Sequence, residues 1–362
     1  MFHPGPDSKA IGRGSQIAPA NRFERTRTEA DYEQLTEEDI GDGDRKLATE
    51  FFPDQTKSLI TENDSPDVGF RFSINPYRGC EHGCAYCYAR PGHEFLGLNA
   101  GLDFETKIFV KHNAAELLRD ELSQPSWRGD ESITISGVTD CYQPAERKFR
   151  VTRRILEVLL EARQTCGVIT KNALVARDLD LLAPLAEMRL VRVFISITTL
   201  DHELARALEP RTSPPAKKLA AVRALASGGV PVGVMVAPII PGLTDNEVPA
   251  ILGAAAEAGA KGAGYVLLRL PFAVRPIFED WLARNRPQQF ERVISRIRTT
   301  RGGGMYQTGW GVRQTGTGEY AEQIANTFKV FKKKHGLDGE LPPLDYSLFR
   351  PPRSGSGQMQ LF

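Results

Sequence analysis

The sequence predicts an α/β fold built around a parallel sheet. From Val68 onward, short runs rich in Val, Ile and Thr alternate with longer segments whose apolar residues recur every three or four positions. The short runs are typical of buried strands, and the longer segments are typical of amphipathic helices. Their alternation is the pattern of βαβ units, which place parallel strands side by side. A chain of 362 residues is also long enough to bury a large core.

Each predicted strand is a short apolar run, and a predicted helix follows all but the last. The strands span residues 70–74, 132–136, 167–171, 191–197, 230–237 and 264–269. The helices span residues 113–122, 153–163, 179–187, 215–227 and 248–258. The fourth helix is closed by Gly228 and Gly229, because glycine is favoured just after a helix C-terminus.

The flanks of this core differ from it in composition. Residues 1–63 are polar, and only residues 47–52 are apolar enough to dock. Such a segment buries too little surface to order itself, so we expect a largely disordered extension. The expected parts are this extension at 1–63, the core at 64–272, a basic C-terminal region packed on the core at 273–340 and a flexible tail at 341–362.

Charge and hydropathy narrow the class of protein. The net charge is +1, so no global basic signal points to a polyanionic partner. No run approaches the ~18 apolar residues of a membrane span. The first residues, Met-Phe-His-Pro-Gly-Pro, lack the basic and apolar regions of a signal peptide. We therefore expect a cytoplasmic protein with no membrane partner, whose thiols stay reduced.

A cysteine-rich loop directly follows the first predicted strand. Cys80, Cys84 and Cys87 stand at C-x3-C-x2-C spacing, and they are three of the five cysteines in the chain. Three thiolates at this spacing suit one face of an iron–sulfur cube and leave one iron open for a small molecule. On spacing alone, zinc with Cys141 or Cys166 as fourth ligand is an alternative. An odd number of cysteines without a secretory signal disfavours disulfides.

The motif and the words around it resemble the radical S-adenosylmethionine (SAM) superfamily, and within it the spore photoproduct lyase-like branch. The resemblance runs from about residue 64 to about residue 320. Its words are NPYRGCEHGCAYCYARP, GLDFETKIFVK, TDCYQPAER, EPRTSPPAKKLAAVRAL and PIIPGLTD. It implies a partial (β/α)6 barrel of the TIM type, open at the side, with its chemistry at the C-terminal ends of the strands.

The resemblance also implies two cofactors and a reaction. Cys80, Cys84 and Cys87 would hold a [4Fe-4S] cluster, and SAM would chelate the open iron. Reductive cleavage of SAM would give a 5′-deoxyadenosyl radical that abstracts hydrogen from the substrate. That chemistry belongs to the cofactors, while the protein binds and orients them.

Several further residues match positions that contact SAM in the family. Tyr86 would contact the adenine through its backbone, and Tyr88 would lie near the 5′ carbon. The word from Ser136 to Asp140, with Gly137 and Thr139, stands where the superfamily often has a Gly-Gly-Glu-like word that receives the SAM amino group. This chain departs from that word, since it has one glycine and an aspartate three residues later. Plain core aromatics are the alternative reading of the two tyrosines.

The remaining SAM contacts are implied at the ends of the next three strands. Lys171 resembles a carboxylate-binding residue, and Ser196 a hydroxyl that contacts the ribose or carboxylate. Glu209 and Arg211 resemble a loop that closes over the same groups, for which the planar fork of arginine is suited. Pro238 belongs to a backbone edge that resembles the one pairing with adenine. A solvated lysine, a structural serine and a simple turn are the ordinary alternatives.

Cys141 and Tyr88 are the candidate catalytic residues. Cys141 directly follows the second strand, on the side where the radical would form. A thiol has a weak S–H bond and would return a hydrogen atom to a product radical, as a cysteine does in spore photoproduct lyase.

The C-terminal region has a local excess of positive charge. Between Arg284 and Lys334 there are eleven Arg or Lys and three Glu, with Tyr306 and Trp310 among them. Basic residues interleaved with aromatics suit a phosphate backbone and splayed bases. A solvated helix face is the alternative.

The last residues, Gln358-Met-Gln-Leu-Phe362, follow a Gly/Ser linker. They resemble the peptide that docks on the bacterial sliding clamp, in which Leu and Phe fill an apolar pocket and the linker provides reach.

The sequence thus predicts a radical SAM enzyme acting on nucleic acid in a lyase-like DNA repair reaction. An electron donor such as flavodoxin or ferredoxin would be a further partner. Two alternatives stay open. One is radical SAM modification of tRNA, a peptide or a small molecule, and the other is a non-catalytic iron–sulfur protein that binds DNA or the clamp.

Overall fold

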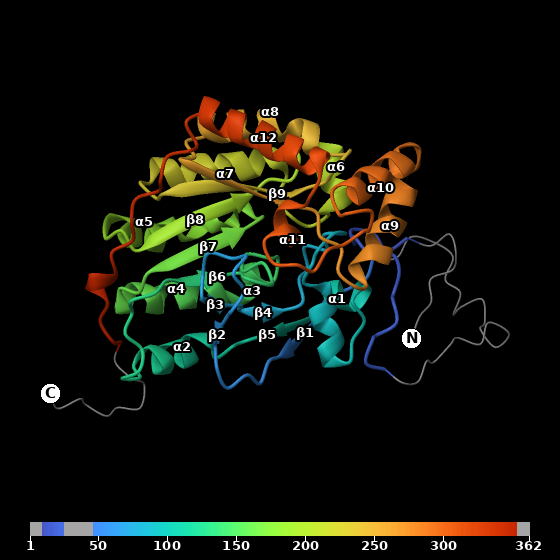
Figure 1. Ribbon diagram of the computed structural model, residues 1–362. Coiled ribbons are helices and arrows are strands. Elements are labelled where there is room, and N and C mark those ends of the chain that lie inside the picture. Colours follow the sequence, from blue (N-terminus) through green and yellow to red (C-terminus); the bar gives the residue numbers. More distant parts are fainter. Residues whose placement is uncertain (1–8, 25–45, 353–362) are drawn as a thin grey trace, which may run out of the picture.

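The computed structural model describes residues 9–24 and 46–352, which form a layered α/β structure around one large sheet (Figure 1). The strand order is β10-β9-β8-β7-β6-β3-β2. Neighbours from β3 to β10 pair in parallel, and β2 pairs antiparallel with β3. The strands are β2 (Ile60–Glu62), β3 (Phe72–Ile74), β6 (Ile133–Ile135), β7 (Cys166–Thr170), β8 (Val191–Ser196), β9 (Val232–Ile239) and β10 (Gly262–Leu267).

All six predicted strands and all five predicted helices are confirmed. Five helices connect successive strands of the large sheet. They are α2 (Ala114–Leu122), α4 (Val151–Ala162), α5 (Leu179–Glu187), α7 (Pro215–Ser227) and α8 (Val248–Glu257). Each turns an apolar stripe towards the sheet, as α4 does with Ile155, Leu156 and Leu159, which are fully buried. The parallel strands lie in chain order, and this open order is consistent with the predicted partial barrel.

Residues predicted to be disordered contribute two strands. β1 (Glu50–Pro53) pairs in parallel with β5 (Lys107–Val110), which also pairs with β4 (Tyr77–Arg78) in a second, three-stranded sheet. The prediction of disorder is therefore wrong for residues 46–63, which include β1 and β2. Residues 1–8 and 25–45 lie outside the described residues.

The described segment 9–24 is also fixed to the core, although it is polar. Arg13 donates from Nη1 to the Glu105 carbonyl oxygen at 2.7 Å, and the Ser15 backbone N–H donates to the Glu105 carboxylate at 2.8 Å. Arg13, Ser15 and Asn21 are buried. Buried hydrogen bonds to the backbone and side chain of distant Glu105 thus hold a segment that has little apolar surface of its own, and composition does not reveal such bonds.

The C-terminal region adds α9 (Val274–Asn285), α10 (Phe290–Thr299), α11 (Val312–Thr315) and α12 (Glu319–Lys334). Val274, Phe278 and Trp281 of α9 share a buried apolar cluster with Cys84 and Tyr86 of the cysteine loop. α12 packs on α8 and α10. The shorter helices are η1 (Arg90–Leu96), α1 (Leu102–Thr106), α3 (Glu146–Phe149), η2 (Ala173–Asp178), α6 (His202–Leu208), η3 (Asp245–Glu247), η4 (Pro287–Gln289) and η5 (Tyr346–Leu348).

The predicted flexible tail is docked over its first part. Arg192 donates to the Pro342 carbonyl oxygen at 2.7 Å, and the Arg350 backbone N–H donates to that of Ala162 at 2.9 Å. Phe349 fills the space beside Gly129, where an added Cβ would come within 2.1 Å of its ring. The prediction is wrong for residues 341–352, while residues 358–362 lie outside the described part.

Among the described residues, we find no helix whose length and apolar character would allow it to span a membrane.

Candidate active site

The cysteine loop lies at the C-terminal edge of the parallel sheet. It follows β4 and leads into η1, on the side towards which the arrowheads of β7 and β8 point in Figure 1. The Cys80 backbone N–H donates to the Phe104 carbonyl oxygen at 2.9 Å, and that of Ala85 to Leu208 at 3.0 Å. Gly83 has a φ of +65°, and a Cβ there would approach the Glu105 carboxylate to 2.5 Å. The loop is therefore fixed at both ends and requires glycine at its tip.

Cys80, Cys84 and Cys87 are free thiols, and the first two are only 6% exposed. Burial is the main reason that the pKa of Cys80 is raised, and the neighbouring charges of Asp140, Cys87 and Cys84 raise it further. Burial likewise raises the pKa of Cys84. Three neighbouring thiolates, two of them buried, need positive charge to be stable, and iron would supply it. This donor set fits an iron–sulfur cluster. Within the described ranges, no three His, Cys, Asp or Glu side chains are arranged to hold a single metal ion.

The buried ion pair of Arg90 and Glu105 holds the cysteine loop in place. Arg90 Nη2 lies 2.5 Å from Glu105 Oε1, and both side chains are fully buried. Arg90 also donates to the Cys84 carbonyl oxygen at 2.9 Å and to that of Gly101 at 2.9 Å. The second oxygen of Glu105 accepts from the Gly14 backbone N–H at 3.0 Å. The pair therefore ties the loop, α1 and the N-terminal segment together.

A second buried network lies beside the cysteines and centres on Glu209. Its carboxylate accepts from the Tyr86 hydroxyl, from Thr198 at 2.5 Å and from Lys218 at 2.6 Å. Lys171 Nζ lies 3.4 Å from the same carboxylate. Burial alone would raise the pKa of Glu209, but the charges of Lys171 and Lys218 outweigh it, and the pKa lies well below its ordinary value.

Of the predicted SAM residues of the third to fifth strands, Lys171 and Glu209 belong to this network. Lys171 donates to the Ala237 carbonyl oxygen at 2.7 Å, directly before Pro238. Ser196, at the end of β8, is 6% exposed. Glu209 faces the interior at 2% exposure, and Arg211 lies 3.1 Å from Glu81. Glu209 and Arg211 are thus engaged within the protein, in contacts that the resemblance did not imply.

The predicted SAM-binding motif after β6, residues 136–140, forms a tight turn. Ser136 has a φ of +82°, a value that side chains rarely adopt, and its hydroxyl donates to the Thr139 carbonyl oxygen at 2.5 Å. Gly137 offers its carbonyl oxygen to Tyr88. Asp140 accepts from the Thr170 hydroxyl and the Lys171 backbone N–H, each at 2.7 Å. Asp140 therefore couples β6 to β7.

His82 connects the cysteine loop to this turn. Its Nδ1 lies 3.4 Å from Asp140 Oδ2, and its Nε2 lies 3.2 Å from the Asn172 side-chain nitrogen. Burial tends to raise the pKa of Asp140, but His82 and the hydrogen bonds outweigh it, so the pKa is lowered.

The two candidate catalytic residues have opposite surroundings. Cys141 is fully buried in the main core, and its thiol faces the Ile169 carbonyl oxygen at 3.8 Å. This position argues against a hydrogen donor, which has to reach a substrate radical. Tyr88 is 48% exposed, and its hydroxyl donates to the Gly137 carbonyl oxygen at 2.7 Å.

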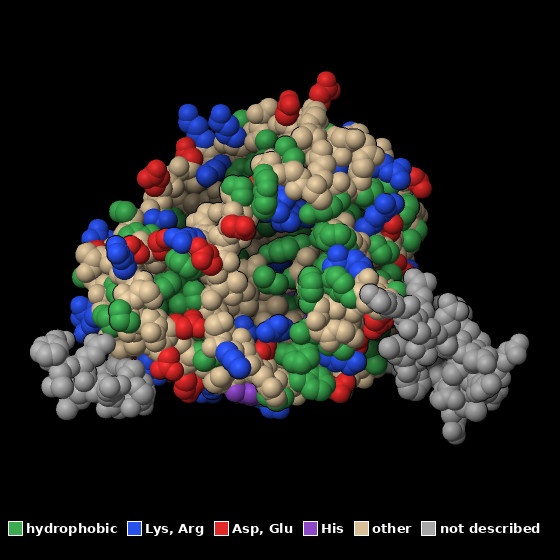
Figure 2. Space-filling model, turned by 60° about the horizontal axis from the view of Figure 1, so that its bottom comes forward, with side chains coloured by type: hydrophobic (Ala, Val, Ile, Leu, Met, Phe, Trp, Pro, Cys, Tyr) green, Lys and Arg blue, Asp and Glu red, His purple; other side chains and the backbone are tan. Residues whose placement is uncertain are grey.

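Three exposed rings lie at this edge of the sheet, and each is stacked with an arginine. Arg269 lies 5.2 Å from the ring centre of Tyr88, Arg22 lies 3.9 Å from that of Phe272, and Arg313 lies 4.0 Å from that of Trp310. Phe272 is 62% exposed and Trp310 57%. We call Tyr88, Arg269, Phe272 and Trp310 the mouth. Figure 2 shows a face that is hollowed near its centre, with hydrophobic and basic side chains around the hollow.

Arg301 fixes the Trp310 side of the mouth to β10. It is 2% exposed, and it donates to the Leu268 carbonyl oxygen at 2.6 Å and to that of Arg313 at 2.9 Å. The loop that carries Trp310 is thereby held against the C-terminal end of the sixth parallel strand.

Sequence reasoning missed Lys218, Thr198, the Arg90–Glu105 pair and Arg269. A signal for Lys218 was present, because it lies on the buried stripe of α7 with Ala221, Val222 and Leu225. Arg269 stands alone between leucines in the word Leu-Leu-Arg-Leu-Pro. A charged residue within an apolar run indicates a position where the charge has a structural or functional role.

The chain belongs to the radical SAM superfamily. A sequence model described as Radical SAM superfamily matches residues 74–255, from β3 to within α8. The superfamily uses a [4Fe-4S] cluster and SAM, in agreement with the predicted cofactors and with the donor set described above.

Relatives with sequence similarity are uncharacterized. A protein of Mycobacterium tuberculosis is 41% identical over 231 residues, which cover 63% of this chain and 66% of that protein. A protein of Methanocaldococcus jannaschii is 28% identical over 277 residues, which cover 76% of this chain and 92% of that protein. The chain thus spans slightly less than two thirds of the mycobacterial relative.

Solved structures with the same fold include spore photoproduct lyase. A variant of that enzyme, with bound AdoMet and dinucleoside spore photoproduct, has a TM-score of 0.57 at 17% identity, covering 79% of this chain and 78% of that one. At this identity the similarity establishes the fold alone.

Proposed function

We propose that the protein is a radical SAM enzyme that acts on a nucleic-acid strand, with a damaged or modified base as its target. The observation that carries the substrate class is the mouth, where three exposed rings are each stacked with an arginine and one of them, Tyr88, directly follows Cys87. Exposed rings next to cations suit bases that stack and a backbone that is negatively charged.

Cys80, Cys84 and Cys87 are the residues that would hold the cluster, and they leave one iron for SAM. When both are bound, they supply a carbon radical that removes a hydrogen atom from the substrate. The surrounding residues would bind and orient SAM. Lys171, whose side chain is 17% exposed, is the candidate partner for its carboxylate, and the backbone at Ala237 and Pro238 is the candidate edge for adenine.

The basic C-terminal region contributes less to this surface than its charge suggests. Arg284 pairs with Asp280, Arg313 pairs with Asp67, and Arg301 is buried. Arg292 donates to the Gly242 carbonyl oxygen at 3.0 Å. The cations that face the substrate would therefore be concentrated at the mouth, and exposed Arg298 and Lys329 would add long-range attraction.

The substrates to test first follow from the structural neighbour. Since spore photoproduct lyase has been crystallised with a dinucleoside photoproduct, ultraviolet-irradiated DNA is a rational starting point, and undamaged DNA and tRNA are the comparisons.

Radical SAM enzymes need a reductant, and we propose a flavodoxin or ferredoxin for this role, in a cytoplasmic setting. The clamp-like word at residues 358–362 lies outside the described part of the chain, and docking on a sliding clamp stays a prediction.

The proposal is tested on protein reconstituted with iron and sulfide without oxygen. Wild type and Cys166→Ala are expected to bind about four irons and, once reduced, to release 5′-deoxyadenosine from SAM, whereas Cys84→Ala is expected to do neither. Cys166 is the matched control because it is buried in β7, away from the loop. Iron binding without any nucleoside would contradict the enzyme proposal. Nucleoside release that no nucleic acid accelerates would contradict the substrate class.

A further inference from the structure

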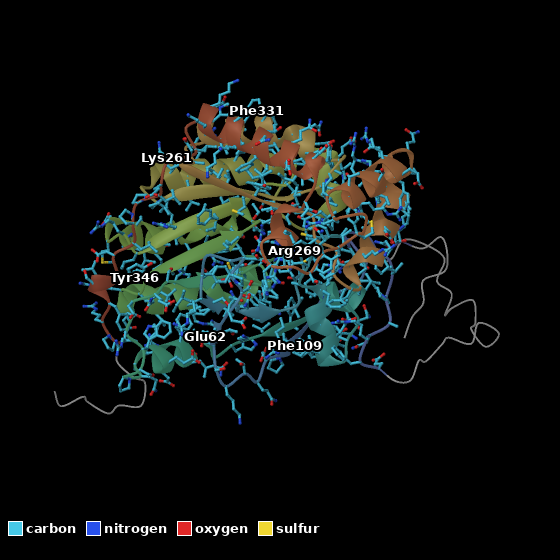
Figure 3. The ribbon with its side chains drawn as sticks, viewed as in Figure 1. Glu62, Phe109, Lys261, Arg269, Phe331 and Tyr346 are labelled. Carbon is cyan, nitrogen blue, oxygen red and sulfur yellow. The ribbon has the colours of Figure 1, made fainter. Side chains whose placement is uncertain are left out.

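Arg269 stands at the mouth without an acidic partner. It follows β10 by two residues, so it lies at the C-terminal edge of the sheet (Figure 3). Within the described part of the chain, Arg269 makes no ion pair or hydrogen bond, and its Nε is buried without a partner. A buried N–H of this kind is costly unless a ligand or water completes it.

The surroundings of Arg269 carry excess positive charge. Arg301 lies close enough that Arg269, after burial, contributes to lowering the pKa of Arg301 to about 10. The nearby carboxylate, Asp67, is already occupied by Arg313 and by the Gly311 backbone N–H at 2.6 Å. Arg269 and Arg313 thus both act on Asp67, and that carboxylate is bound to Arg313.

The position of Arg269 is defined with respect to the cysteine loop. Its guanidinium lies 5.2 Å from the ring centre of Tyr88, the residue after Cys87. The Tyr88 hydroxyl is in turn held by the Gly137 carbonyl oxygen at 2.7 Å. An anion bound to Arg269 would therefore lie next to Tyr88, an exposed side chain that directly follows the last cluster ligand.

We propose that Arg269 forms a subsite for a phosphodiester group of the substrate strand and positions the neighbouring nucleotide at Tyr88. Five N–H donors in a planar fork match two phosphate oxygens, and the positive charge of Arg301 behind them strengthens the attraction. This inference rests on the proposed function, since it names how a nucleic-acid substrate is held at the same site. A carboxylate of SAM has the same chemistry, and the experiment separates the two.

The test measures binding of a fluorescent single-stranded oligonucleotide to the reconstituted protein over a series of salt concentrations. Arg269→Gln is expected to weaken binding about tenfold at low salt and to reduce the slope of log K against log salt by about 0.7, the value for one phosphate contact on a single strand. Arg269→Lys is expected to recover the slope but only part of the affinity, because it keeps the charge and loses the fork.

Lys261→Gln is the matched control. Lys261 is exposed and immediately precedes β10, so this variant removes the same charge at the opposite end of the strand that Arg269 follows (Figure 3). It is expected to bind with the wild-type slope.

The outcomes separate this inference from the proposed function. If wild type binds no oligonucleotide, the nucleic-acid proposal itself fails. If wild type binds and Arg269→Gln has the same slope and affinity, only the subsite is contradicted. The SAM concentration that gives half-maximal 5′-deoxyadenosine release, measured without oligonucleotide, is expected to be unchanged in Arg269→Gln. A large rise in that concentration would assign Arg269 to SAM and overturn the inference.

Discussion

The buried ion pairs under the cysteine loop differ from the mouth in how their charged residues are paired. We call Arg90, Glu105, Lys171, Glu209 and Lys218 the floor. Under the cysteine loop the buried carboxylates are paired with cations, since Glu105 has Arg90, and Glu209 has both Lys171 and Lys218. At the mouth Arg269 has none among the described residues, and Arg301 is bound only to carbonyl oxygens. Burying a charge is costly unless it is paired, so the paired region is built to hold its shape. We expect the unpaired charge at the mouth to be neutralised by a bound anion.

The comparison predicts its largest effect at Glu105. Glu105→Ala should lower the free energy of unfolding by about 5 kcal/mol, because it leaves Arg90 buried without its partner and frees two backbone N–H groups of the N-terminal segment. Urea unfolding monitored by circular dichroism measures this. Glu279→Ala, which breaks the exposed pair with Arg275, should cost less than about 1 kcal/mol. Equal losses in the two variants would remove the distinction between the regions.

Glu209→Gln should have the next largest effect, about 3 kcal/mol, because Lys171 and Lys218 then lose their shared carboxylate. The effect should depend on pH in one direction. The pKa of Glu209 in the folded protein lies below its ordinary value of 4.5, so its contribution is fully present above pH 4.5 and is lost as the pH falls through the lowered pKa. The difference between wild type and variant should thus be constant from neutral pH to about 5 and narrow in stronger acid. A difference that grows on acidification would contradict this assignment.

Arg269→Gln should change the free energy of unfolding by less than about 1 kcal/mol, since only stacking on Tyr88 is lost. Thermal and urea unfolding of the reconstituted protein check this. A loss as large as that of Glu105→Ala would mean that Arg269 has a structural partner and belongs to the floor.

Trp310→Ala should have the smallest effect on stability, about 0.5 kcal/mol, because the ring is mostly exposed. Oligonucleotide affinity should nevertheless fall by about 1–3 kcal/mol if one base stacks on the ring. Fluorescence anisotropy with the same protein preparation measures both the affinity and its salt dependence, and the slope should stay at the wild-type value. Unchanged affinity would exclude Trp310 from the binding surface.

Most of the fold could be predicted from the sequence because its helices and strands are locally encoded. α5 and α7 have the predicted bounds, residues 179–187 and 215–227, since their apolar stripes are continuous. β1 and the docked residues 341–352 could not be predicted, because polar or irregular segments are held there by partners far away in sequence. Arg192, for instance, binds the Pro342 carbonyl oxygen across 150 positions.

The candidate site divides along the same line. The three cysteines form one short sequence motif, so their role could be predicted from their spacing. The bonds that position them join residues from different elements, such as Glu209 and Lys218 or Asp140 and His82. Each member alone resembles an ordinary surface or helix residue, and only the fold brings it to its partner. The burial of Cys141 illustrates the converse, since a position after the right strand did not determine which way its side chain faces.

The contact between Gly14 and the cysteine loop has a consequence for how firmly the three cysteines are held. A Cβ at Gly14 would come within 1.7 Å of the Gly83 carbonyl oxygen, so the N-terminal segment lies directly on the turn between Cys80 and Cys84. The spacing of these two cysteines therefore depends on a segment far away in the chain. Gly14→Ala should displace this segment from the loop, and the reconstituted protein should then bind less iron.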